Sequence, residues 1–302
     1  MLTGIHLLLT YTCLFECDHC FLYCGPRAEG TFTARQMEKV LDEAVKIHTV
    51  KWIYLEGGEP FLFYPLMLEG IRRAQQRGFH TGIVTNAYWA TSFEDAVLWL
   101  QPLKELDVTE LSISDDVFHY GEDQDNPAKN ALAAARKLQL PAGEICIESP
   151  TVRKHGDPSG VKGRPVVGGG VRFRGRAADK LTADLPTTDW KKLRQCPDED
   201  IADPGRVHID AYGNVHLCQG LCIGNCWQTP LSEIVAKYDP NRHPVCGPLM
   251  RGGPAAVVTE LGTQHEKKYV DECHLCYHSR RQLIERFPDC LGPRQVYGFC
   301  DE

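Results

Sequence analysis

The sequence of 302 residues has no long apolar run and no excess of basic side chains. None of its segments approaches the ~20 uninterrupted apolar residues of a membrane-spanning helix. Lys and Arg number 33 against 40 Asp and Glu, which gives a net charge of −7. A mildly acidic chain without a basic stretch has no electrostatic footprint for nucleic acid or for an anionic membrane. We therefore expect neither nucleic acid nor a membrane among its partners.

The N-terminus also lacks the positively charged start of a secretory signal, since the first lysine or arginine is Arg27. This absence predicts a cytoplasmic protein. The contents of apolar residues (43%) and charged residues (24%) are typical of a folded globular chain and exclude a disordered one. Cysteine is abundant, with 14 residues. In a reducing compartment, clustered cysteines indicate metal ligands rather than disulfides.

The first half of the chain alternates apolar strand-like runs with amphipathic helical stretches. Strands are predicted at 4–10, 52–55, 81–85, 110–114 and 144–148, with helices at 34–45, 65–78, 94–106 and 127–138. This rhythm predicts an α/β fold with a parallel sheet, open or curved toward a barrel, and an active face at the carboxyl ends of the strands. Residues 171–176 are predicted to add one more strand, and 151–170, rich in Gly and Pro, form a predicted loop or lid.

The alternation ends near residue 185, and most of the cysteines follow it. We predict two domains, one over 1–185 and a smaller, cysteine-rich one over 186–302.

The first cysteine motif, CxxxCxxC, follows the first predicted strand and consists of Cys13, Cys17 and Cys20. Three closely spaced thiolates can hold three corners of a cubane [4Fe–4S] cluster and leave the fourth iron without a protein ligand. Such an iron can bind and activate a substrate. The alternative is a zinc site with Cys24 as its fourth ligand.

This cysteine loop resembles that of the radical S-adenosylmethionine (SAM) enzymes. Gly57-Gly58-Glu59-Pro60, after the second strand, resembles the family's GGEP motif, although such a segment alone also fits an ordinary strand-to-helix turn. The resemblance implies a partial (β/α)6 TIM-like barrel and a [4Fe–4S] cluster whose open iron is chelated by S-adenosyl-L-methionine. It also implies reductive cleavage of SAM to a 5′-deoxyadenosyl radical that abstracts a substrate hydrogen. The GGEP segment is expected to receive the amino group of SAM, for which the Glu59 carboxylate is suited.

The same resemblance implies further SAM contacts at the ends of the strands. His19, just before the third cysteine, is expected near the adenine. Asn86 ends the third strand, and Ser112 and Ser114 end the fourth, where relatives place groups near SAM or substrate. For each of them, a polar residue that merely finishes a strand is the alternative.

Other charged side chains are candidates by position alone. One of three arginines is a candidate partner of the SAM carboxylate: Arg172, Arg174 and Arg176. Three residues after the fourth strand, Asp116, His119 and Tyr120, are candidate bases for substrate, but a solvated loop is favoured because the sequence identifies no partner for them.

The second cysteine group resembles the auxiliary-cluster extension called SPASM, or its shorter version, twitch. Its members are Cys196, Cys218 at the end of a predicted hairpin, and Cys273 and Cys276 at the start of a predicted helix. The resemblance implies one auxiliary [4Fe–4S] cluster with four thiolates, which suits electron transfer. The remaining cysteines leave a second auxiliary cluster open, but a single cluster is favoured, with each of them as a buried apolar residue or a free thiol: Cys222, Cys226, Cys246, Cys290 and Cys300.

Taken together, these features predict a radical SAM oxidoreductase with an auxiliary cluster. Its substrate is either a peptide or a small metabolite, and its partner a low-potential electron donor such as flavodoxin or ferredoxin. The alternative from a different class is a non-enzymatic zinc or iron–sulfur protein that binds or senses.

Overall fold

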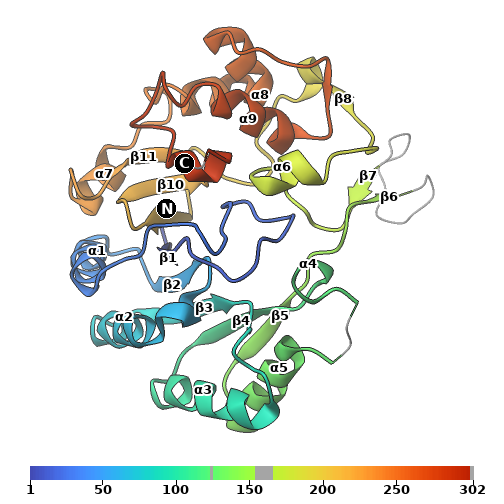
Figure 1. The fold of residues 1–302 in the computed structure, drawn as a ribbon. Coiled ribbons are helices and arrows are strands. Elements are labelled where there is room, and N and C mark those ends of the chain that lie inside the picture. The colour runs from blue at the N-terminus through green and yellow to red at the C-terminus, as the bar shows by residue number, and fades with distance from the viewer. Residues whose placement is uncertain (123–124, 154–165, 300–302) are drawn as a thin grey trace.

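The computed structural model describes residues 1–122, 125–153 and 166–299, and its centre is one large sheet (Figure 1). Most of the lid predicted at 151–170, and Cys300, lie outside the described residues. Among the helices that are described, none is long and apolar enough to cross a membrane.

The eight-stranded sheet has the order β11-β10-β9-β1-β2-β3-β4-β5. Its strands are β1 (Gly4–Thr10), β2 (Trp52–Gly57), β3 (His80–Thr85), β4 (Glu110–Ser114), β5 (Ala142–Ile145), β9 (Arg206–Asp210), β10 (Asn214–Cys218) and β11 (Leu221–Asn225). The strands from β9 to β5 in this order pair in parallel, whereas β10 and β11 are antiparallel additions. The predicted parallel α/β architecture of a partial barrel is therefore confirmed.

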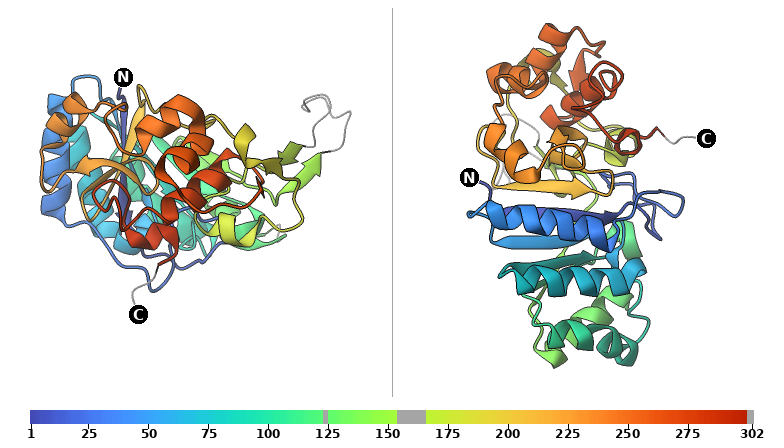
Figure 2. Two further views of the ribbon diagram at one scale, coloured as in Figure 1. Left: turned by 90° about the horizontal axis from the view of Figure 1, so that it is seen from above. Right: turned by 90° about the vertical axis from the view of Figure 1, so that its left-hand side faces the viewer.

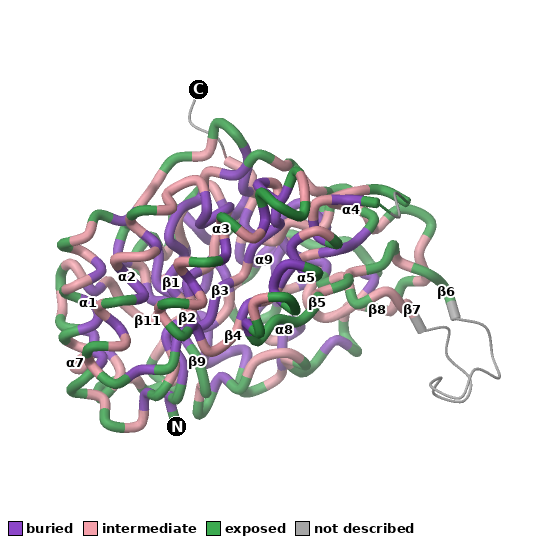
Figure 3. The backbone as a smooth tube through the Cα atoms, turned by 90° about the horizontal axis from the view of Figure 1, so that it is seen from below, coloured by how far each residue is buried: buried purple, intermediate pink, exposed green. Residues whose placement is uncertain are grey.

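Helices connect the parallel strands and cover one face of the sheet. They are α1 (Ala34–Lys46), α2 (Tyr64–Gln76), α3 (Phe93–Glu105) and α5 (Pro127–Leu138). Figure 2 shows α1 and α2, in blue, side by side along the sheet. On this face, the alternate residues of β1, β2, β4 and β9 are apolar and buried, as Ile5, Ile53 and Leu111 illustrate. These strand residues and the apolar helix stripes form the core, which runs through the centre of the molecule (purple in Figure 3).

The opposite face of the sheet carries polar side chains at the alternate positions. His6 on β1 stacks on Tyr54 of β2 with ring centroids 4.5 Å apart. The Tyr54 hydroxyl donates to Glu110 of β4 at 2.8 Å. Glu56 and His208 lie on the same face of β2 and β9. The sheet therefore separates an apolar core from a polar inner face, which is the lumen of the partial barrel.

The sixth parallel strand is not where the sequence predicted it. Residues 171–176 form no strand; instead this segment passes the first cysteine loop, where the Arg176 amide donates to the Cys20 carbonyl at 2.9 Å. The place beside β1 belongs to β9, with Ile5 opposite Val207. Sequence periodicity identified β9 as a hairpin strand, but it cannot show which edge of the sheet that hairpin joins.

The C-terminal part, yellow to red in Figure 1, lies beside β1, and α3 and α5 lie toward the other end of the sheet. Its helices are α6 (Arg176–Lys180), α7 (Leu231–Lys237), α8 (Cys246–Leu261) and α9 (Glu272–Arg281), with 3₁₀ turns η2 (Trp190–Lys192) and η3 (Arg294–Tyr297). Small strand pairs join β8 (Thr188–Asp189) to β12 (Lys268–Tyr269) and β6 (Thr151–Arg153) to β7 (Val166–Gly168). The predicted hairpin and terminal helix are present as β9, β10 and α9.

Helix α1 begins with a capping box. The Gln36 amide donates to the Thr33 hydroxyl oxygen at 3.2 Å, and the Thr33 amide donates to the Gln36 side-chain oxygen at 2.8 Å. Thr33→Ala removes one acceptor, so we expect the free energy of unfolding to fall by ~1 kcal/mol in chemical denaturation. Thr187→Ala, at an exposed threonine, is the control. Equal stability of the two variants would contradict the role of the cap.

Candidate functional site

The loop between β1 and α1 brings the first three cysteines to one cavity. Cys13, Cys17 and Cys20 all line a cavity of about 140 Å³ at the carboxyl end of the sheet. The buried Arg176 holds the loop through two hydrogen bonds. Its Nη1 donates to the Cys17 carbonyl and its Nη2 donates to the Cys24 carbonyl, both at 2.8 Å. Arg176 therefore positions the loop, a role that the sequence did not predict.

Two of the three thiols, those of Cys13 and Cys17, are poor acids as long as no cation balances them. Burial raises the pKa of Cys13 to about 11, and burial also raises the pKa of Cys17 above its usual range. Cys20 differs, because a hydrogen bond with Cys24 lowers its pKa to about 6. The two thiols that resist ionisation fit a cationic group, because iron binds the thiolate form and offsets the penalty of burial.

The glycines of the GGEP segment allow its backbone to touch the cysteine loop. The Gly58 amide donates to the Thr10 carbonyl at 2.6 Å, and the Glu59 amide donates to the Thr12 carbonyl at 3.0 Å. A Cβ atom at Gly58 would lie 2.1 Å from the Thr12 oxygen, so only glycine fits. Gly57 and Gly58 both line the cavity. The two motifs that are far apart in sequence thus form one continuous wall.

Glu59 is directed into the protein and not into the cavity. Its carboxylate is fully buried and accepts from the Phe61 amide at 3.0 Å, the Thr85 hydroxyl at 2.8 Å and the Asn86 amide at 2.8 Å. Burial raises its pKa to about 7. Glu59 therefore fastens the GGEP turn to the end of β3, and the 3₁₀ turn η1 (Pro60–Phe63) starts directly after it.

Of the other four residues predicted to contact SAM, three line the cavity and one does not. His19, Asn86 and Ser114 line the cavity with the cysteines, and Asn86 Nδ2 lies 3.6 Å from Cys13 Sγ. Ser112 lies two residues before Ser114 on the same face of β4, deeper in the lumen, where its hydroxyl donates to Glu110 at 3.3 Å. The structure also adds Glu56, Thr85 and His119 to the lining. The alternation of side chains along β2 places Glu56 on the inner face, and this alternation is the sequence signal that could have identified Glu56.

Asp116 and His119 do not lie in a solvated loop, and that interpretation is wrong. Asp116 caps the short helix α4 (Val117–Tyr120), and its side chain is only 1% exposed. His119 Nδ1 lies 2.8 Å from Asp116 Oδ1. The ring of His19 lies 5.3 Å from that of His119, and burial lowers the pKa of His19 to about 4, so His19 is neutral. The cavity therefore has a carboxylate–imidazole pair at one side.

The four cysteines of the second group line a separate pocket. Cys196 precedes β9, Cys218 ends β10, and Cys273 and Cys276 lie in the first turns of α9. The structure thus brings together all four residues that the SPASM or twitch resemblance implied.

The same pocket contains two buried guanidinium groups. Arg280 is 1% exposed and has no carboxylate partner among the described residues; its Nη2 points at Cys218 Sγ at 3.8 Å. Arg174 donates to the same sulfur at 2.8 Å and lies 3.6 Å from Glu199. A buried cation needs a compensating negative charge. Four thiolates around an iron–sulfur cluster carry that charge, so the residues present fit an auxiliary cluster.

Cysteines outside this pocket occupy other places in the described C-terminal part. Cys222, Cys226 and Cys246 are buried, and Cys290 is half-buried. Cys222 Sγ lies 3.5 Å from His216 Nδ1, in a buried network that Asp210 completes. These positions are typical of small buried side chains, and none of them lines the four-cysteine pocket.

Both cysteine groups are more widely spaced than one zinc ion requires. Sulfurs that share one zinc ion lie within ~4 Å of each other, because Zn–S bonds are ~2.3 Å long. In the described part of the chain, three or more candidate ligand atoms lie within 4.8 Å of one another in two places, His6–Glu56–His208 and His19–Asp116–His119. Neither includes a cysteine. The wider spacing fits a cubane, whose thiolates bind different irons.

Comparison with known proteins agrees with this geometry. Residues 7–147 match the Radical SAM superfamily, a span that runs from β1 to just beyond β5 and includes both motifs at the cavity. Residues 7–147 therefore correspond to a radical SAM domain, and this superfamily is characterised by a [4Fe–4S] cluster and SAM.

Two curated relatives match part of the chain. YydG of Bacillus subtilis (strain 168), whose name assigns it to peptide biosynthesis, is 26% identical over 125 residues, which is 41% of this chain and 39% of YydG. The tungsten-containing aldehyde ferredoxin oxidoreductase cofactor-modifying protein of Pyrococcus furiosus is 34% identical over 114 residues, 37% of this chain and 30% of that protein. The chain thus aligns with less than two-fifths of the length of either relative.

A solved structure extends the likeness in fold beyond the matched segment. The crystal structure of BtrN in complex with AdoMet and 2-DOIA has a TM-score of 0.51 to this chain and covers 79% of this chain and 83% of BtrN. The two sequences are 14% identical, so the likeness concerns the fold.

Gly58→Ala tests the contact between the two motifs. The added methyl group overlaps the Thr12 carbonyl, so we expect the cysteine loop to shift and the first cluster, with about four irons, to be lost in large part. Iron and sulfide per chain are measured after anaerobic reconstitution. Gly143→Ala is the control because its Cβ meets nothing within 4 Å. Full iron content in Gly58→Ala would contradict the tight contact.

Arg280→Gln tests the charge balance of the second pocket. Without the buried guanidinium, the negative cluster loses its compensating charge, and we expect a chelator to remove its iron roughly tenfold faster. The loss is followed by absorbance and iron analysis. Arg242→Gln, at an exposed arginine, serves as the control. Equal rates in the two variants would show that Arg280 does not stabilise an anionic group.

Proposed function

We propose that this chain is a radical SAM oxidoreductase that holds the SAM-binding [4Fe–4S] cluster on Cys13, Cys17 and Cys20. One observation carries the proposal: these three thiols and the GGEP glycines line a single cavity at the carboxyl ends of parallel strands. Active sites of such barrels lie at this end. Residues 186–302 are proposed as an auxiliary domain with a second [4Fe–4S] cluster on Cys196, Cys218, Cys273 and Cys276.

When bound, these groups supply the 5′-deoxyadenosyl radical that removes a hydrogen atom from the substrate, and an acceptor for the electron that remains on it. The protein supplies the walls of the cavity in which these groups would bind. The Gly57–Gly58 backbone allows close approach of the SAM methionine part, Asn86 orients toward Cys13, and His19 offers a neutral, half-buried ring. Burial excludes water from the reactive centre.

His119 is the residue best placed to take a proton from the oxidised substrate. The Asp116 carboxylate accepts a hydrogen bond from His119 Nδ1, so Nε2, the other nitrogen of the His119 ring, is the basic one. A net two-electron oxidation releases one hydrogen atom, one electron and one proton, and His119 lines the cavity where that proton is released. Asp116 stabilises the protonated ring.

The substrate is proposed to be a peptide or a small polar molecule. The match to YydG, a protein named for peptide biosynthesis, supports a peptide. The likeness in fold to BtrN, crystallised with 2-DOIA, supports a small molecule as the second candidate. In both cases the polar inner face of the sheet provides hydrogen-bonding groups next to the cavity. The electron donor is proposed to be a flavodoxin or ferredoxin in a reducing, cytoplasmic environment.

Variants of the two cysteine groups separate this function from a non-enzymatic zinc or iron–sulfur protein. We expect the reconstituted chain to release 5′-deoxyadenosine from SAM with dithionite, and a Cys13, Cys17, Cys20 triple alanine variant to lose this activity and about four irons. A quadruple alanine variant at Cys196, Cys218, Cys273 and Cys276 should lose about four irons and still release 5′-deoxyadenosine.

The control is Cys146→Ala, because Cys146 is exposed and belongs to neither group. A zinc-containing protein, or one with iron but no SAM cleavage, would favour the binding or sensing protein. Retention of SAM cleavage by the triple variant would contradict the assignment of the first cluster.

A further inference from the structure

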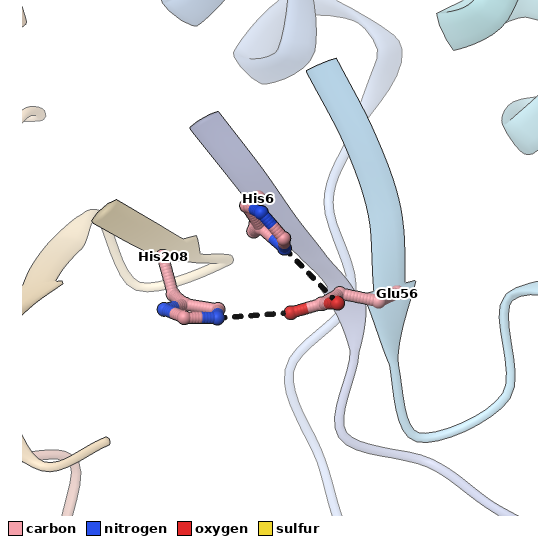
Figure 4. A group of neighbouring side chains, drawn as sticks. All are labelled: His6, Glu56 and His208. Carbon is pink, nitrogen blue, oxygen red and sulfur yellow. Dashed lines mark ion pairs between the residues drawn. The ribbon is translucent and has the colours of Figure 1, made fainter. Parts of the chain in front are cut away.

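Three side chains converge on the polar inner face of the sheet, and the proposed function uses none of them (Figure 4). His6 belongs to β1, Glu56 to β2 and His208 to β9. His6 Nδ1 lies 3.1 Å from Glu56 Oε2, and His208 Nε2 lies 3.2 Å from Glu56 Oε1. One ligand atom from each residue lies within 4.8 Å of the other two.

The strand register holds the three side chains in place. His6 is directly opposite His208 on one side and Tyr54 on the other, and Glu56 is two residues beyond Tyr54 on the same face. The ring of His6 is fixed by stacking on Tyr54 at 4.5 Å. Donors on neighbouring strands of one sheet are rigid, and rigid donors are what a metal site requires.

The group is largely shielded from solvent. The side chains of His6, Glu56 and His208 are 15%, 17% and 6% exposed. In the part of the chain that the structure describes, Glu56 has no lysine or arginine partner; its ion-pair partners are the two histidines. A largely buried carboxylate flanked by two imidazole nitrogens, with no lysine or arginine beside it, has the donor set of a cation site.

We propose that His6, Glu56 and His208 bind one divalent first-row metal ion in the barrel lumen. Imidazole and carboxylate together suit Mn²⁺, Fe²⁺ and Zn²⁺, and two histidines with one carboxylate leave coordination positions open. Two ligands ~2.1 Å from one ion lie ~3.0–3.4 Å apart, and the two nitrogen–oxygen distances of 3.1 and 3.2 Å meet this requirement.

The open positions face the lumen, because Glu56 also lines the cavity with the three cysteines. An ion there would bind an oxygen atom of a molecule in the cavity, such as a carbonyl, carboxylate or hydroxyl group. The metal site itself does not rest on the proposed function, since it uses no cysteine.

Mn²⁺ is the probe of choice because it prefers nitrogen and oxygen ligands to thiolates. The tag-free, cluster-loaded protein is titrated with Mn²⁺, and free Mn²⁺ is followed by electron paramagnetic resonance. We expect one saturable site in the wild-type protein, and binding at least tenfold weaker in Glu56→Gln and in His208→Gln. Glu110→Gln is the matched control, since Glu110 is another carboxylate on the inner face and should leave Mn²⁺ affinity unchanged.

Two further readouts separate loss of a ligand from loss of the fold. Iron per chain should be equal in all variants, which shows that they carry their clusters. In the wild-type protein alone, the spin echo of bound Mn²⁺ should show coupling to imidazole nitrogen. No saturable binding, bound Mn²⁺ without nitrogen coupling, or equal affinity in Glu56→Gln would each overturn the proposal and leave the three residues as an ion-pair group only.

Discussion

The contact between two backbones at the end of the sheet is the constraint on which the site depends. The amides of Gly58 and Glu59 bind the carbonyls of Thr10 and Thr12, so the loops that follow β1 and β2 are joined edge to edge. A side chain at Gly57 or Gly58 would push these two loops apart, so glycine is a steric requirement at both positions. The buried Glu59 extends the same connection to β3 through Thr85 and Asn86. Three consecutive strand ends thus form one wall, and the cysteines are presented from it.

The second pocket, lined by the later four cysteines, depends on charge compensation, whereas the first depends on close backbone contact. Arg174 and Arg280 place two guanidinium groups beside one sulfur, Cys218 Sγ, in a part of the molecule that water does not reach. Such groups are stable only near negative charge. Hydrogen bonds and nearby cations also raise the reduction potential of an iron–sulfur centre, because they favour its more negative state. The arginines therefore suit a centre that accepts electrons.

Much of the fold was predictable from the sequence because local patterns determine it. Apolar strand-like runs located β1 and β4 residue for residue, and the amphipathic helical pattern located the start of α1. Both cysteine groups were also recognisable, since their spacing is a local property. What could not be predicted depends on tertiary contacts. The partner edge of β9, the inward direction of Glu59 and the burial of Asp116 all arise from segments distant in sequence. The inner-face trio of His6, Glu56 and His208 is of the same kind, because its three members come from separate strands.

The pairing of β9 with β1 has a mechanical consequence. Strand β1 leads directly into the first cysteine loop, and β9 leads through its hairpin to Cys218. Neighbouring strands in a continuous hydrogen-bonded ladder cannot slide or hinge without breaking several bonds at once. The two thiol pockets are therefore fixed at a constant separation, so that, with the two proposed clusters bound, an electron passing between them would always cross the same stretch of protein. A fragment that stopped at residue 185 would expose the unpaired edge of β1, so the N-terminal half needs its C-terminal neighbour to complete its sheet.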